Sequence, residues 1–346
     1  MDVKTATIDP RGHQATSPWQ MPRAAWKDIA LRTYKRTWDD NVGLVAAGVA
    51  FYAFFALLSL LGLIVLAYGF AADPVTVIEH MQALTGVLPT DVAFIIGDQL
   101  MNAVKASQKT KGLGILLAFL VATYGGTNGA ASIITALNIA YEEKEKRSLI
   151  RFYSLAVTMT LVALVVALCA IAATAALASL QHLLPKAATP LVIAGKVLGY
   201  LLLLAFAAGI ASTLYRFGPS REDARWKWIT PGSLFAAVTL LVLTWAFGLY
   251  VGHFTNYHAS YGSLGAVVAL LTWMYLSSYA FIFGAELNSE IEHQTAMDST
   301  TGSPRPLGER GAWAADHVAT DDQPDSHAPS LKEAGPESPI SDDQKS

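Results

Sequence analysis

The chain has 346 residues, of which 53% are hydrophobic and 15% are charged, and its net charge is −3. Soluble globular domains carry about a quarter charged residues, so this composition argues against an ordinary soluble domain. The small net charge provides no overall positive field, and we expect no nucleic-acid partner.

Residues 1–23 are polar and contain scattered prolines, so we expect them to be disordered and not to form a cleavable signal peptide. In residues 24–40 apolar and small side chains recur at helical spacing, while Lys and Arg fill much of the other face. This pattern predicts an amphipathic helix. Two interpretations are equally good: the helix lies on the inner leaflet of the membrane, or it packs against the rest of the protein as a cytoplasmic helix.

Six apolar stretches follow, and each is about long enough to cross a bilayer, which takes about 20 residues. They cover residues 43–70, 113–140, 152–184, 191–217, 229–251 and 264–287. Their interiors carry no charge except Lys196 near the start of the fourth and Glu286 at the end of the sixth. Buried soluble helices rarely reach such lengths six times. The sequence therefore predicts an all-α, polytopic membrane protein with a six-helix transmembrane domain over residues 41–292, in contact with the lipid bilayer.

The long connection between the first two stretches, residues 71–111, is too apolar for a linker and too interrupted for another crossing. Its second half places apolar side chains from Val92 to Val104 on one stripe of a helix, with polar residues elsewhere. We expect amphipathic helices on the outer side of the membrane here, capping the bundle rather than gripping lipid head groups.

Lys and Arg concentrate before the first stretch and in every second connection, namely residues 23–36, 144–151 and 216–227. By the positive-inside rule these segments face the cytoplasm. Both termini are therefore expected to be cytoplasmic. After Glu292 the composition changes to Ser, Asp, Glu, Pro, Gly and Thr, and residues 293–346 are predicted to form a disordered cytoplasmic tail.

The second stretch contains an unusual run of small and polar residues from Tyr124 to Ser132, with Asn128 near its centre. One interpretation is a seam where helices pack closely. The other is a hinge or unwound segment that lines a cavity, as in transporters.

The sixth stretch ends with two glutamates, Glu286 and Glu290, which are four residues apart and share a helix face. A carboxyl group this close to the hydrocarbon is costly unless it is paired, protonated or hydrated. The functional interpretation is a cation site or proton relay. The structural interpretation, which we favour, is that the glutamates mark the helix end in the membrane interface.

No metal or cofactor site is predicted. Cys169 is the only cysteine, so disulfides within the chain and cysteine-built metal sites are excluded. His253 and His258 lie five residues apart without nearby carboxylates, which is a weak zinc pattern. No phosphate-binding loop of the Gly-x-x-x-x-Gly-Lys-Ser/Thr type occurs.

Four segments carry a family likeness: residues 46–56 (AAGVAFYAFFA), 136–147 (ALNIAYEEKEKR), 215–231 (YRFGPSREDARWKWITP) and 261–290 (YGSLGAVVALLTWMYLSSYAFIFGAELNSE). Together they resemble the YihY/BrkB family of bacterial inner-membrane proteins. The resemblance implies a protein of the bacterial cytoplasmic membrane with six helices. This chain departs from the family pattern at Ser59, where many relatives have Pro, and at Asn128, where many have Arg.

The family was long labelled a tRNA-processing ribonuclease, a label that the histidines allow us to test. A metal-dependent nuclease needs His and carboxylate ligands gathered around its metals. The eight histidines are instead spread over both predicted sides of the membrane and the tails: His13, His80, His182, His253, His258, His293, His317 and His327. We therefore expect no ribonuclease activity, and we expect the protein not to be an enzyme.

Two hypotheses on function remain. In the first, the first, second and sixth stretches line a path for a lipid or small solute, with Asn128, Glu286 and Asn288 facing inward together. In the second, the protein acts through partners in envelope integrity or serum resistance, and the polar residues are satisfied between helices. The sequence predicts neither a substrate nor an oligomeric state. The candidate transport or structural residues are Tyr52, Asn128, Asn138, Tyr141, Tyr261, Glu286, Asn288 and Glu290.

Overall fold

The computed structural model describes residues 11–71, 108–163, 165–166, 189–253 and 263–319. Regular structure in these residues is helical, apart from an isolated antiparallel bridge between Ala224 and Thr300. The expected all-α class is therefore confirmed. The predicted outer amphipathic region falls largely on residues 72–107, outside the described part of the chain.

The first two helices meet at a sharp break. After a short 3-10 turn at Pro18–Gln20, α1 covers Arg23–Asp39 and α2 covers Val42–Ala71, with a bend of 65° between them. Asn41 at the break adopts a φ of 50°, a left-handed conformation that Asn tolerates better than most residues. The helix predicted at residues 24–40 and the first apolar stretch are therefore separate elements, as the sequence predicted, and α1 buries Ala25, Ile29, Thr33 and Thr37.

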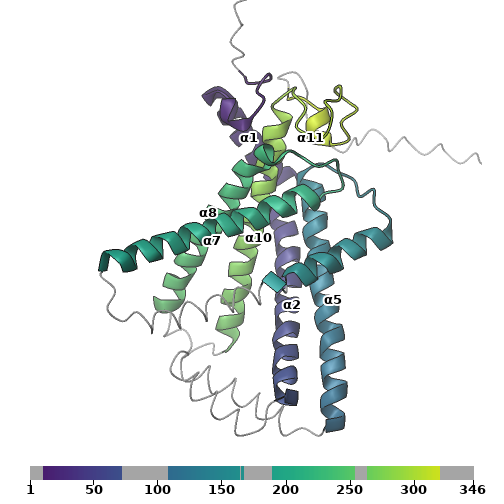
Figure 1. Cartoon of the computed structure of the whole chain (residues 1–346), viewed down its shortest axis with the longest axis vertical. Helices are drawn as coiled ribbons and strands as arrows, with labels where there is room; N and C mark the ends of the chain where they lie inside the picture. Colours follow the sequence, from purple (N-terminus) through teal and green to yellow (C-terminus); the bar gives the residue numbers. More distant parts are fainter. Residues whose placement is uncertain (1–10, 72–107, 164, 167–188, 254–262, 320–346) are drawn as a thin grey trace, which may run out of the picture.

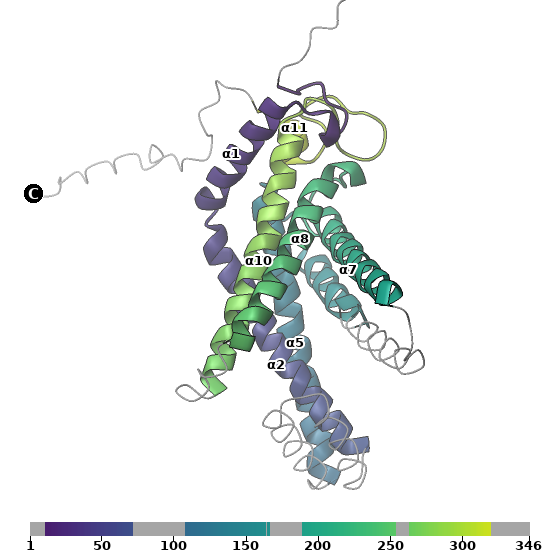
Figure 2. The same ribbon diagram turned by 90° about the vertical axis from the view of Figure 1, so that its left-hand side faces the viewer.

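Helix α5, Gln108–Ala140, runs beside α2 (Figures 1 and 2). A Cβ atom on Gly125 would lie 3.2 Å from Ala56 Cα, and one on Gly126 would lie 2.5 Å from Thr160 Cγ2. The small residues therefore allow close helix packing. Because α5 is helical throughout this run, the interpretation as an unwound segment is wrong, and the close contacts at Gly125 and Gly126 support the packing interpretation.

The remaining long helices are α7 (Thr189–Phe217), α8 (Trp226–His253) and α10 (Ser263–His293), and a further helix is described at Leu149–Ala163. Helix α7 packs on α8, α8 on α10, and α10 in turn on α2 (Figure 2). Three helices are long and apolar enough to cross a membrane among the described residues, or up to four if α1 and α2 form one broken span. The large apolar side chains of α7 from Val197 to Phe206 are largely exposed, as expected for a lipid-facing helix.

Buried apolar side chains gather toward one end of the bundle. The main cluster combines the start of α2, the end of α5, the end of α7, the start of α8 and the last third of α10. Its largest fully buried members include Tyr141, Tyr215 and Leu137. Among the side chains that the structure describes, those toward the opposite end are mostly exposed, so the buried core lies beside the segments that connect α5 to α8.

Two segments expected to be disordered are ordered. Residues 294–319, with the short helix α11 (Trp313–Asp316), cover the same end of the bundle as residues 11–22 (Figure 1). The two segments are bonded to each other: Ala296 N donates to His13 O at 2.8 Å and Thr295 Oγ1 to Ala15 O at 2.7 Å. The prediction of disorder is therefore wrong for residues 11–22 and 294–319. Polar side chains and backbone hold these segments, and a hydropathy pattern does not register such contacts.

Candidate functional site

A group of buried and half-buried polar residues lies at the end of the bundle where both terminal segments meet. We call it the polar cluster. Its members come from the second half of α1 and the break after it, the end of α5 and the residue that follows it, the α7–α8 connection and the last part of α10. They are Arg32, Arg36, Asp40, Asn138, Tyr141, Ser220, Arg221, Glu286, Asn288, Glu290 and Glu292.

Arg221 and Glu292 form the most buried ion pair of the cluster. Arg221 Nη2 lies 2.7 Å from Glu292 Oε1, and both side chains are fully buried. Ser299 Oγ donates to the other carboxylate oxygen at 2.8 Å, and the Arg221 guanidinium lies 4.2 Å from the centre of the Tyr141 ring. Burial lowers the pKa of Arg221, but Glu292 and Tyr141 raise it by more, so the guanidinium stays charged. Burial also raises the pKa of Tyr141, which keeps its hydroxyl neutral.

Glu290 is held by two arginines and lies beside a histidine. Arg32 Nε lies 2.6 Å from its Oε2, Arg36 Nε lies 3.4 Å from its Oε1, and His293 Nδ1 lies 3.5 Å from Oε2. Arg36 also pairs with Glu142, just beyond α5. The buried Glu290 carboxylate, paired with two arginines of α1, therefore ties α10 to α1.

Glu286 shares that helix face but has a different environment. Its side chain is only 2% exposed, and its Oε1 finds no hydrogen-bond donor among the described residues. Its carboxyl group lies against the carboxyl group of Asp40, with Arg36 and Glu290 also nearby. A buried carboxyl group that faces another acid is costly, and such groups concentrate at functional sites.

Asn288 joins α10 to α8. Its Oδ1 accepts from Gly232 N at 2.7 Å, and its Nδ2 donates to Ile229 O at 3.0 Å. Pro231 lies between these two residues inside α8 and interrupts the helix hydrogen bonding. The amide of Asn288 therefore satisfies backbone groups at this irregular turn.

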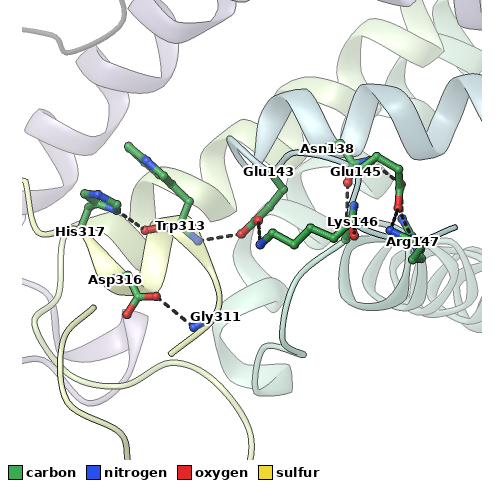
Figure 3. Close-up of polar contacts among 10 residues, drawn as sticks. Asn138, Glu143, Glu145, Lys146, Arg147, Gly311, Trp313, Asp316 and His317 are labelled. Carbon is green, nitrogen blue, oxygen red and sulfur yellow. Dashed lines mark hydrogen bonds and ion pairs between the residues drawn. The ribbon is translucent and has the colours of Figure 1, made fainter. Parts of the chain in front are cut away.

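Asn138 plays a similar role at the end of α5 (Figure 3). Its Oδ1 accepts from Ser220 N at 2.7 Å and its Nδ2 donates to Glu145 Oε2 at 2.9 Å. Glu145 also accepts from Arg147 Nε at 2.7 Å. Partial burial raises the pKa of Glu145, but the hydrogen bonds from Arg147 and Asn138 outweigh it and bring that pKa to about 2. This network fixes the α7–α8 connection against the end of α5.

The C-terminal segment is attached through Glu143 (Figure 3). Glu143 Oε1 accepts from Trp313 N at 2.7 Å, while Lys146 Nζ lies 3.0 Å from Oε2. Trp313 stacks on His317 with ring centres 4.6 Å apart and lies under Arg36 at 5.3 Å. The segment beyond α10 thus contacts the same arginine that holds Glu290.

The structure brings together five of the eight sequence-predicted residues: Asn138, Tyr141, Glu286, Asn288 and Glu290. Tyr52 and Asn128 belong to the α2–α5 pair instead. Asn128 Nδ2 donates to Tyr124 O of its own helix at 2.8 Å, so the expected inward group of Asn128, Glu286 and Asn288 does not form. Tyr261 lies outside the described residues.

Sequence reasoning missed several members of the cluster. Arg221, Ser220 and Glu292 lie at the boundaries of apolar stretches, where charged residues are expected from membrane orientation or from a helix end. The sequence offered one signal for them: Ser220 and Arg221 lie within the family-like segment 215–231, and Glu292 follows the segment 261–290 by two residues. Asp40 was taken only as the end of a cytoplasmic helix.

An open surface hollow of about 590 Å³ lies beside the cluster, between residues 146–147, the α7–α8 connection and Gly311. Basic Lys146, Arg147 and Arg221 line it together with acidic Glu222 and Asp223. Each arginine is already bonded to a carboxylate, so the hollow is mixed in charge. Within the described residues no three His, Cys, Asp or Glu side chains are placed to hold a metal ion.

The apolar helices and the polar cluster at one end define a polytopic α-helical membrane protein. The family described as Virulence factor BrkB matches residues 33–307, and the chain belongs to this family. The family predicted from the sequence is therefore confirmed.

Two curated relatives show how far the likeness extends. The chain is 28% identical over 244 residues to the ribonuclease-like protein YfkH of Bacillus subtilis (strain 168), which covers 65% of this chain and 86% of the relative. It is also 37% identical over 78 residues to a UPF0761 membrane protein of Xanthomonas campestris pv. campestris (strain B100). This second alignment covers 22% of this chain and 18% of that relative. No solved structure matches the chain.

Proposed function

We propose that the protein is a transporter or lipid-handling protein of the bacterial inner membrane. The observation that carries the proposal is Glu286, a carboxyl group that is 2% exposed, has no donor to Oε1 within the described part of the chain and lies near the end of an apolar helix. An acid in this position is expensive for the fold, and in membrane proteins such groups mark ion and substrate paths. The polar cluster around it supplies both charged groups and amides at one end of the bundle.

The proposal includes six spans with both termini in the cytoplasm. Five of the six apolar stretches coincide with long helices, and the third begins with the helix Leu149–Ala163. The two terminal segments are hydrogen-bonded to each other at the end that carries the basic connections, which supports a common side for them. Single cysteines introduced after removal of Cys169, tested with a membrane-impermeant thiol reagent in intact cells, give the sidedness of each connection.

Reconstitution tests the function directly. Proteoliposomes with a fluorescent phospholipid in both leaflets, treated with an impermeant quencher, report lipid movement, and vesicle swelling reports passage of small solutes. We expect one of the two rates to exceed that of protein-free vesicles, and Glu286→Gln to reduce it. Asn128→Ala is the matched control, because Asn128 bonds only within α5. Rates equal to protein-free vesicles with both probes would overturn the proposal.

The alternative is an envelope protein that acts through partners without transport. It is favoured by Asn288 and Asn138, whose amides are satisfied between elements as a closed bundle requires. Loss of serum or detergent resistance on deletion, restored equally by the wild type and by Glu286→Gln, would favour this alternative.

We do not extend to this chain the word ribonuclease in the name of the Bacillus subtilis relative. Among the described histidines, His13 bonds to the backbone of Gln294, His317 stacks on Trp313, and His293 lies beside Glu290. These positions serve the attachment of the terminal segments. Incubation of the purified protein with tRNA and Mg²⁺, Mn²⁺ or Zn²⁺ tests this part of the proposal, and we expect no cleavage above that of a mock purification.

A further inference from the structure

We propose that Asp40 and Glu286 share one bound proton, and that this pair is the protein's proton-binding site. The two residues come from different elements: Asp40 follows α1 at the break before α2, and Glu286 lies in the last part of α10. The site therefore joins the sharp bend between α1 and α2 to α10, the helix that contacts most of the other described helices.

The chemistry of two carboxyl groups requires the proton. The carboxyl groups of Asp40 and Glu286 lie within hydrogen-bonding reach of each other. An ionised carboxylate only accepts hydrogen bonds, so a contact between two of them has no donor. Two buried carboxylates at this separation repel strongly, and one retained proton both removes a charge and supplies the donor. Glu286 Oε1, to which no other group in the described ranges donates, is the matching acceptor or donor atom.

The other charges around Glu286 do not replace that proton. Arg36 of α1 is the nearby cation, but it already contacts Glu142 and Glu290. Glu290 on α10 and Tyr141 beyond α5 add one further acid and one neutral hydroxyl. On α8 the charged residue is Lys227, which donates to Thr16 O in the N-terminal segment. Around Glu286 the acidic groups therefore outnumber the cations, because the nearby Arg36 is shared with Glu142 and Glu290. This balance favours a protonated pair.

The break between α1 and α2 gives the proton a structural consequence. Asn41, directly after Asp40, holds the left-handed conformation that turns the chain by 65°. When the pair loses its proton, the two adjacent carboxylates repel each other. This repulsion weakens the contact between α1 and α10. Proton release is therefore coupled to the position of α1 against α10. If the protein transports, as proposed above, the proton is its coupling ion.

Infrared difference spectroscopy of the full chain in nanodiscs tests the site without any substrate. A protonated carboxyl group has a C=O stretch distinct from the carboxylate bands, and it shifts in D2O. We expect this band in the wild type at pH 7 and its loss in both Glu286→Gln and Asp40→Asn. Glu290→Gln is the control: its carboxylate is paired with Arg32 and Arg36, so the band should remain.

Two results would overturn the inference: absence of the band in the wild type at pH 7, or its survival in both Glu286→Gln and Asp40→Asn. The wild-type spectrum decides even if a variant fails to fold, which size-exclusion chromatography detects. The band is measured without flux, so its outcome is separate from that of transport. If the band is present but neither lipid nor solute moves, the proton site stands and the proposed function is wrong. If lipid or solute moves but the band is absent, the proposed function stands and the proton site is wrong.

Discussion

Arg221 in the α7–α8 connection and Glu292 near the end of α10 form an ion pair in which neither side chain is exposed to solvent. Such a pair gains little over apolar residues of the same size, because both charges lose their hydration. Removing one partner is different, since it leaves a buried charge without compensation. The pair therefore makes the α7–α8 connection depend on the end of α10.

Arg221→Met and Glu292→Gln should each lower the free energy of unfolding by about 3–5 kcal/mol. The double variant should lose less than the sum of the single losses, because no unpaired charge remains. Thermal or denaturant unfolding in detergent, analysed as a double-mutant cycle, gives the coupling between the two residues. Strictly additive losses would mean that the pair contributes nothing as a pair.

Asn288→Ala should destabilise the contact between α8 and α10. The substitution removes the buried acceptor of Gly232 N, at about 1–3 kcal/mol for an unsatisfied group, whereas Ile229 O keeps its hydrogen bond from Ser233 Oγ at 2.5 Å. Asn128→Ala is the matched control, because that amide bonds to its own helix and is partly exposed. Comparison of the two unfolding midpoints checks the prediction, and equal midpoints would contradict it.

Gly284→Ala should disturb the same helix pair by crowding. A Cβ atom at Gly284 would lie 2.6 Å from Gly232 O, and one at Gly232 would likewise meet Gly284 O. The backbones cannot stay this close with a methyl group between them, and overpacking of this kind costs about 1–3 kcal/mol. Gly199→Ala on α7 has open space around it and should be neutral or slightly stabilising. Thermal unfolding of both variants distinguishes the two positions.

Hydropathy was sufficient for the positions of the long helices, because about 20 consecutive apolar residues allow few alternatives to a membrane helix. It did not predict the polar cluster as a whole. Glu286 and Asn288 stood out because they interrupt an apolar pattern, but Arg221 and Glu292 lie among other charges, and nothing local indicates that they are buried together. The partners of a buried charge come from distant parts of the chain, so only the tertiary structure shows which charges are paired.

The ordered terminal segments were missed for a related reason. Residues 294–319 are rich in polar residues, Gly and Pro, which is also the composition of disordered chains. Here the Arg310 side chain and the Asp316 carboxylate bond to the backbone and take the place of an apolar core. Glycines at Gly302, Gly308 and Gly311 adopt positive φ and allow the tight turns between these contacts.

Stability should fall at low pH in part through Glu145. Its pKa is lowered from 4.5 to about 2 in the folded protein, so its ionised form stabilises the fold above pH 4.5. This contribution is lost as the pH falls from 4.5 through about 2, since the proton then binds in both states. Glu145→Gln should therefore make the unfolding midpoint less dependent on pH in this range. An unchanged acid slope in the variant would show that Glu145 is not part of the acid response.

Arg310→Ala should release the C-terminal segment from the bundle. Arg310 is only 5% exposed. Its guanidinium donates to Ala315 O at 2.6 Å and to Ala296 O at 2.8 Å, two carbonyls from different parts of the segment. Without it, those carbonyls lose charged donors and the segment loses its central contact, so limited proteolysis between residues 296 and 315 should become faster. Arg305→Ala is the control: that side chain is 45% exposed and pairs with Glu222 only at 3.7 Å, so its removal should change cleavage little. Equal cleavage rates in the two variants would mean that the contacts of Trp313 with Glu143, and not Arg310, hold the segment in place.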